Sequence, residues 1–110
     1  MEVNIEYLES LLEANDNMKK IIDNIVKVTD DELVYNTKVH QRITASIPLY
    51  IPLMQAKFKD NNLDYLNEDF IFELRKKITK IYRMKGFYVY LTNHQSETDV
   101  CLTVTNEILT

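Results

Sequence analysis

Basic side chains cluster between residues 75 and 85, where they could bind phosphate groups. Six of these eleven residues are lysine or arginine: Arg75, Lys76, Lys77, Lys80, Arg83 and Lys85. Tyrosines stand close by at positions 82, 88 and 90, and aromatic rings can stack on bases while cations neutralise phosphates. The segment is therefore a candidate nucleic-acid contact, although a solvated helix face gives the same pattern.

The basic segment precedes a segment in which apolar and polar residues alternate. Together, residues 67–105 resemble the recognition helix and wing of winged-helix DNA-binding domains, which implies contact with duplex DNA through the same six basic side chains. The predicted wing, residues 93–99, has two acids and no base, and the chain carries a net charge of −4. These charges favour a protein partner over nucleic acid, and nucleic-acid binding stays the alternative hypothesis.

Metal and catalytic motifs give a weaker signal. His94, Glu97, Asp99 and Cys101 fall within eight residues, but their spacing matches no zinc pattern. Phosphate-binding loops need several glycines, and Gly86 is the only glycine in the chain. We therefore expect no enzyme, no metal site, no cofactor and no small-molecule substrate. His40 is expected to face the core as a hydrogen-bonded histidine.

Two segments could instead contact another protein. The tandem Ile-Pro-Leu unit of residues 47–53 could form a rigid apolar projection, and the polar face of the C-terminal hairpin, with its unpaired edges, could accept a partner strand. The candidate partner-binding residues are Pro48, Tyr50, Pro52, Tyr88, Tyr90, Thr103 and Thr105. A buried corner between helices is the alternative for the proline segment.

The elements that position these residues are clearest at the C-terminus. Apolar spacing of three and four predicts a helix over residues 67–85, with Asn67 as its N-cap and Gly86 as a left-handed cap. Beyond it, period-two alternation predicts antiparallel strands over about 87–92 and 100–105. The apolar face of this hairpin is expected to pack inward.

Further helices are predicted over about 3–14, 17–28, 30–46 and 52–59. The Asn15-Asp16-Asn17 cluster favours a break between the first two, although one long helix over 3–28 is the alternative. Thr29-Asp30-Asp31-Glu32 has the form of a capping box and predicts a new helix start. The prolines at 48 and 52 predict that this helix ends near residue 46.

The predicted fold class is α+β: a small bundle of four to five helices followed by a C-terminal antiparallel β-hairpin. A length of 110 residues fits a single domain, residues 1–110. The longest uncharged stretch, residues 43–56, is shorter than the about 20 residues that a membrane span needs. With one cysteine and an acidic start, the chain is expected to be cytoplasmic, in a host cytoplasm or a virion if viral.

These observations favour a non-enzymatic protein–protein interaction or assembly protein that acts as an oligomer. The abundance of Asn, Lys and Ile is typical of AT-rich genomes and suggests a small phage or prokaryotic accessory or virion structural component. The expected partner is a second protein, a further copy of the chain, or both, with no membrane involved. The alternative is a winged-helix-type DNA-binding regulator that uses the basic helix 75–85.

Overall fold

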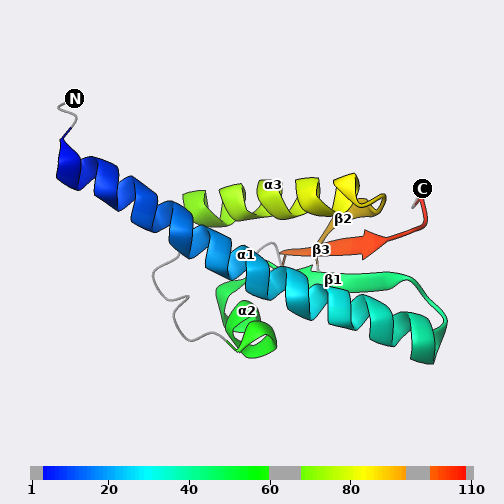
Figure 1. Cartoon of the computed structure of the whole chain (residues 1–110). Coiled ribbons are helices and arrows are strands. Elements are labelled where there is room, and N and C mark those ends of the chain that lie inside the picture. The colour runs from blue at the N-terminus through cyan, green and yellow to red at the C-terminus, as the bar shows by residue number, and fades with distance from the viewer. Residues whose placement is uncertain (1–3, 60–67, 94–99, 109–110) are drawn as a thin grey trace.

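The computed structural model describes residues 4–59, 68–93 and 100–108 and shows an α+β fold with three helices and one three-stranded antiparallel sheet. In chain order the elements are α1 (Ile5–His40), β1 (Thr44–Pro48), α2 (Ile51–Phe58), α3 (Glu68–Met84), β2 (Tyr88–Asn93) and β3 (Val100–Thr105). α1 crosses the length of the molecule, with α3, the sheet and α2 beside it (Figure 1). The predicted bundle of four to five helices with a lone hairpin is therefore wrong.

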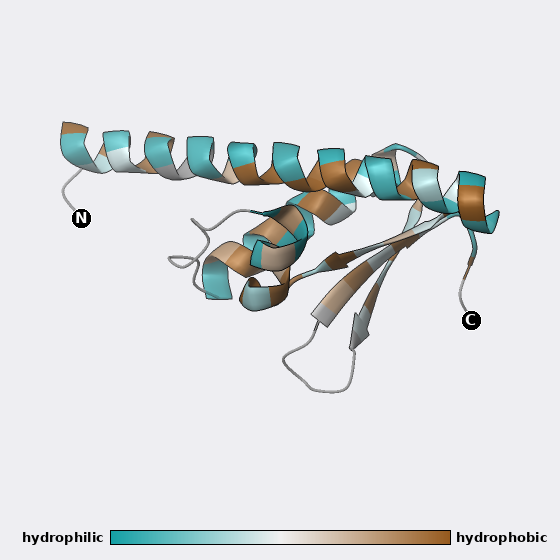
Figure 2. Cartoon of the chain, turned by 90° about the horizontal axis from the view of Figure 1, so that it is seen from below, coloured by the Kyte–Doolittle hydropathy of each residue, from teal (hydrophilic) through white to brown (hydrophobic). Residues whose placement is uncertain are grey.

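One helix replaces the three predicted over 3–14, 17–28 and 30–46. Asn4 caps it, because its side chain accepts a hydrogen bond from the Tyr7 amide at 2.9 Å. The helix passes through the Asn-Asp-Asn cluster, where Asp16 points to solvent. Apolar positions keep helical spacing across the cluster, from Leu11 to Met18 and Ile22, and Figure 2 shows this apolar stripe along α1.

The expected helix start at Thr29 lies within α1, because the acids Asp30 and Glu32 have tertiary partners. Thr29 is fully buried inside the helix. Asp30 accepts a hydrogen bond from Tyr82, and Glu32 pairs with Lys57 at 2.6 Å. These two acids therefore do not cap a helix: Asp30 joins α1 to α3, and Glu32 joins α1 to α2.

The strand β1 is the element that sequence analysis missed, since residues 44–46 were assigned to a helix. α1 ends at His40, and its C-cap Gln41 adopts the left-handed conformation (φ 55°). The Asn36 side chain then donates to the Thr44 carbonyl oxygen at 2.8 Å and fixes the turn into β1. Pro48 is tolerated because β1 is an edge strand.

The sheet has the order β1-β3-β2, so β3 is central and pairs antiparallel with both neighbours. Ala45 pairs with Val104 and Ile47 with Leu102, while Val89 faces Val104 from the other side. All five are buried and form the sheet's apolar face, on which α1 packs against β1 and α3 packs against β2 and β3. The third strand gives the hairpin the support that two strands alone lack.

The end of α3 shows why the one glycine stands at position 86. Gly86 has a φ of 94°. Its amide donates to the Arg83 carbonyl oxygen, and the Phe87 amide donates to the Tyr82 carbonyl oxygen. These are the two bonds of a Schellman motif, and the rings of Phe87 and Tyr82 add an edge-to-face contact at 5.9 Å. The left-handed cap expected at Gly86 is confirmed.

Two opposite substitutions test these helix ends. Gly86→Ala is expected to lower the free energy of unfolding by about 1 kcal/mol through backbone strain alone, because no atom lies within 4 Å of the added Cβ. Gln41→Gly is expected to raise it by about 0.5–1 kcal/mol, because glycine adopts the left-handed conformation without strain. Urea denaturation measures both, and equal effects of the same sign would contradict the assignment.

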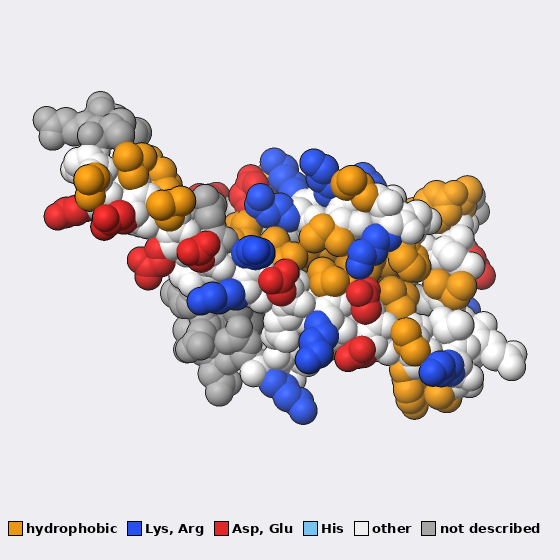
Figure 3. All heavy atoms as spheres, in the orientation of Figure 1, with side chains coloured by type: hydrophobic (Ala, Val, Ile, Leu, Met, Phe, Trp, Pro, Cys, Tyr) orange, Lys and Arg blue, Asp and Glu red, His pale blue; other side chains and the backbone are white. Residues whose placement is uncertain are grey.

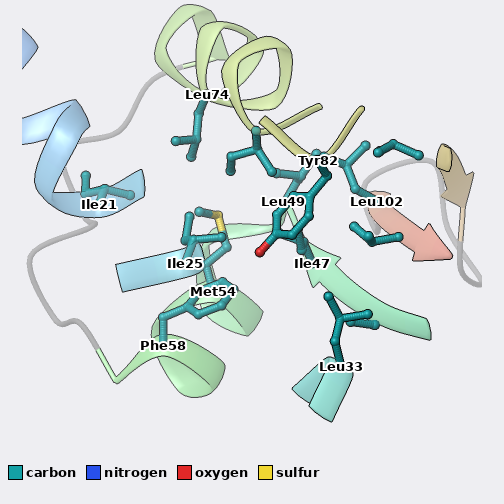
Figure 4. Close-up of a cluster of buried hydrophobic side chains, with 14 residues drawn as sticks. Ile21, Ile25, Leu33, Ile47, Leu49, Met54, Phe58, Leu74, Tyr82 and Leu102 are labelled. Carbon is teal, nitrogen blue, oxygen red and sulfur yellow. The ribbon is translucent and has the colours of Figure 1, made fainter. Parts of the chain in front are cut away.

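The core lies where the three helices meet the apolar face of the sheet. Leu74, Ile78 and Tyr82 of α3 meet Ile25 of α1 and Ile47 of β1 (Figure 4). Met54 and Phe58 bring α2 into the same cluster, and its C-terminus is held by Asn24, which donates to the Phe58 carbonyl oxygen at 3.0 Å. The Lys57 ammonium bonds both Glu32 and the Ser46 carbonyl oxygen, which joins α2 to α1 and β1.

The bounds of α2 and α3 lie within one residue of the predicted helices 52–59 and 67–85. The predicted N-cap Asn67 and the turn residues 94–99 lie outside the described part of the chain.

Candidate interaction surfaces

The first turns of α1, residues 5–16, extend beyond the rest of the molecule (Figures 1 and 3), and we call them the arm. The first buried residue of α1 in the described chain is Ile21. Before it, apolar side chains face solvent: Ile5 is 71% exposed and Leu12 64%, with Leu8 and Leu11 between them. These residues recur with helical spacing, so the arm presents a continuous apolar stripe that none of the residues described by the structure buries.

Acidic residues run beside the apolar stripe of the arm. Glu6, Glu9, Glu13 and Asp16 are spaced i, i+3, i+7 and i+10 and therefore form one row. All four are exposed, and no lysine or arginine occurs before Lys19. Like charges at such spacing destabilise an isolated helix, so this row favours a cationic partner.

The body of α1 is fixed to α3 by a small polar network. The Tyr82 hydroxyl donates to Asp30 Oδ1 at 2.9 Å and lies 3.3 Å from the Val26 carbonyl oxygen. The Lys85 ammonium contacts Asp30 Oδ2 at 3.4 Å and lies over the Tyr82 ring. Burial, the hydrogen bond to Asp30 and the Asp30 charge raise the pKa of Tyr82 above its usual 10.0.

Removal of the Tyr82 hydroxyl tests this network. Tyr82→Phe is expected to lower the free energy of unfolding by about 1–2 kcal/mol, because Asp30 loses its donor. Because the pKa of Tyr82 is higher in the folded than in the unfolded chain, the contribution of its hydroxyl to stability is constant below pH 10. Above pH 10 the Tyr82 hydroxyl of the unfolded chain loses its proton first, and this favours unfolding. Stability should therefore fall more steeply above pH 10 in the wild type than in Tyr82→Phe. Parallel pH profiles would contradict the assignment.

A groove of about 610 Å³ lies between α3 and the sheet, and we call it the basic groove. Its cationic lining comes from α3: Arg75, Lys76, Lys80 and Arg83. Val89, Leu91 and Leu102 of the sheet add an apolar lining. The groove therefore combines an apolar surface with a row of positive charge, and Figure 3 shows basic side chains gathered over α3.

Four of the six basic residues predicted to bind nucleic acid thus line one groove. Within the described chain, Lys80 and Arg83 have no ion-pair partner. Lys76 makes an exposed ion pair with Glu73 at 3.6 Å, and its ammonium lies over the Phe72 ring. Lys85 is used by the Asp30 network, and Lys77 is exposed outside the groove lining. The groove cations are available to an anionic partner.

The predicted partner-binding residues do not form one surface. Thr105 and Pro48 are buried, and Thr103 is half-buried beside Tyr90. Tyr88 and Tyr90 stack at 6.5 Å on the polar face of the sheet, and Tyr88 is exposed on the edge strand β2. Tyr50 and Pro52 are exposed at the start of α2, whereas Tyr88 and Tyr90 belong to β2.

Sequence analysis missed the arm as a surface. Its apolar spacing is that of any amphipathic helix, and only the exposure of residues 5–12 shows that no residue of the described chain buries them. His40 was also misplaced: it is exposed at the end of α1, where its ring meets Tyr35 edge-on at 5.8 Å. Cys101 is buried, and the described residues contain no cluster of metal-ligating side chains.

No family model, curated protein or solved structure matches the chain. Among residues 4–59, 68–93 and 100–108, no helix combines the length and apolar character required to cross a membrane.

Proposed function

We propose that the chain is a non-enzymatic interaction or assembly protein that works as an oligomer, of the kind found among small phage or prokaryotic accessory or virion components. The observation that carries this proposal is the arm, whose apolar stripe is exposed over about two helical turns, from Ile5 to Leu12. Exposed apolar surface of this extent marks protein-binding sites in soluble folds. A cytoplasmic or virion location belongs to the same proposal.

Sedimentation velocity of the purified chain tests the proposal. Over about a hundredfold range of concentration, the mass is expected to rise from the 13.0 kDa of one copy to at least twice that value. A constant mass of one copy, together with no protein recovered on the immobilised chain, would contradict it.

Duplex DNA binding is the second candidate function, and the basic groove favours it. The order helix, strand, helix, helix, strand, strand, with β3 between β1 and β2, is also that of a winged-helix domain. The resemblance stated above for residues 67–105 therefore extends to β1 and α2. On this hypothesis α3 and its cations contact the phosphates.

Low-salt gel shifts test the DNA hypothesis. Lys80 and Lys77 are exposed, so Lys77→Glu with Lys80→Glu should leave the fold intact and weaken DNA binding at least tenfold, with a smaller salt dependence. Lys19→Glu with Lys20→Glu, equally exposed on α1, is the matched control and should have little effect. Absence of retention of the wild type at low salt would exclude this function.

A further inference from the structure

The arm and the basic groove are complementary in both charge and polarity. The arm carries an apolar stripe beside a row of acids, and the groove carries an apolar lining beside a row of cations. Glu9, Glu13 and Asp16 are spaced i, i+4, i+7 along α1, and Lys76, Lys80 and Arg83 have the same spacing along α3. Each row is therefore about 10 Å long.

The arm cannot enter the groove of its own chain. α1 is one continuous helix, and Asp30 within it is bonded to Tyr82 in the last turns of α3. Asp16, the last residue of the arm, precedes Asp30 by 14 residues, or about 21 Å of rigid helix. The arm thus points away from the body that carries the groove (Figure 1).

We propose that the arm of one copy lies in the basic groove of a second copy, and that the second copy returns its own arm in the same way. This inference rests on the proposed oligomeric function and names the surfaces that the oligomer uses. An amphipathic helix in an apolar groove is a common recognition mode. Reciprocal exchange closes a two-fold dimer and doubles the buried area, whereas one-way insertion would build an open chain.

Pairing of two arms with each other is the competing arrangement, and charge disfavours it. In an antiparallel pair that buries Ile5, Leu8 and Leu12, the flanking row of each helix carries Glu9 and Asp16. Residues of this row face one another across such a pair, so carboxylates would oppose carboxylates. The groove offers cations to the same row.

Two charge-reversal variants test the exchange. One reverses the arm (Glu9→Lys with Glu13→Lys), and the other reverses the groove (Lys80→Glu with Arg83→Glu); all four positions are exposed, so both variants should fold. Either variant alone removes the net charge of its surface and places two reversed side chains against residues of the same sign, so the association constant is expected to fall at least tenfold. In an equimolar mixture, a dimer of one arm variant and one groove variant places the reversed side chains of the arm against those of the groove, with opposite signs. Association is therefore expected to return to within about threefold of the wild type.

Sedimentation velocity on nuclease-treated protein measures all four samples. If the groove variant associates as strongly as the wild type, the exchange is overturned and pairing of arms or another face is indicated, while the proposed oligomeric function stands. If the mixture associates no better than its components, the exchange is also overturned. A groove variant that loses only DNA binding would assign the groove to nucleic acid, and a wild type that stays monomeric would overturn both the exchange and the oligomeric function.

Discussion

Replacement of Ile25 with alanine is expected to lower the free energy of unfolding by about 3 kcal/mol, whereas the same replacement at Ile5 should change it by less than about 0.5 kcal/mol. Both residues are isoleucines on α1 with no polar role. Ile25 is 1% exposed and contributes to the core, while Ile5 is 71% exposed on the arm. The difference arises because a cavity forms only where neighbouring side chains surround the lost atoms.

Urea denaturation followed by circular dichroism measures both values, at a protein concentration low enough to keep the wild type monomeric. Equal losses at the two positions would show that the arm packs on its own fold and would contradict its assignment as a surface. Val34→Ala, at a third and exposed position of α1, provides a baseline for the change in helix propensity.

Leu8→Glu combined with Leu12→Glu is expected to weaken self-association at least a hundredfold without loss of the fold. The two leucines lie one helical turn apart in the apolar stripe of the arm, and both are exposed in the single copy. In the oligomer each glutamate would be buried beside apolar side chains, and burial of an unpaired carboxylate is strongly unfavourable. Sedimentation velocity measures the association, and thermal unfolding checks the fold.

The matched control places the same two charges elsewhere on α1. Val34→Glu with Val39→Glu changes exposed apolar residues near the end of the helix, outside the arm. This control is expected to associate as the wild type does. If it dissociates the oligomer and the arm variant does not, the interface lies at the C-terminal end of α1 and the arm has been misassigned.

The C-terminal half of the fold could be predicted from the sequence because its signals are local. Gly86 marks the left-handed position that ends α3, and the period changes from helix to strand directly after it. The antiparallel pairing of β2 with β3 follows from that alternation. No distant residue is needed to decide these elements.

The N-terminal half could not be predicted because its polar residues act over long distances. From the sequence alone, Asp30 and Glu32 fit the first turn of a helix. In the structure, Asp30 accepts a hydrogen bond from Tyr82 and Glu32 forms an ion pair with Lys57. β1 forms from residues whose spacing fits a helix equally well, and only its pairing with β3 decides between the two. The groove cations were predicted, whereas the arm was not, because exposure cannot be derived from helical spacing alone.

Carbodiimide cross-linking of a mixture of unlabelled and ¹⁵N-labelled chains is a direct test of arm exchange, since the reagent joins a carboxylate to a lysine ammonium in contact. Arm exchange predicts cross-links between Glu9 or Glu13 of one chain and Lys76 or Lys80 of the other, identified by peptides that carry one labelled and one unlabelled partner. Cross-linked dimers whose mixed-label peptides never include a groove lysine would contradict it.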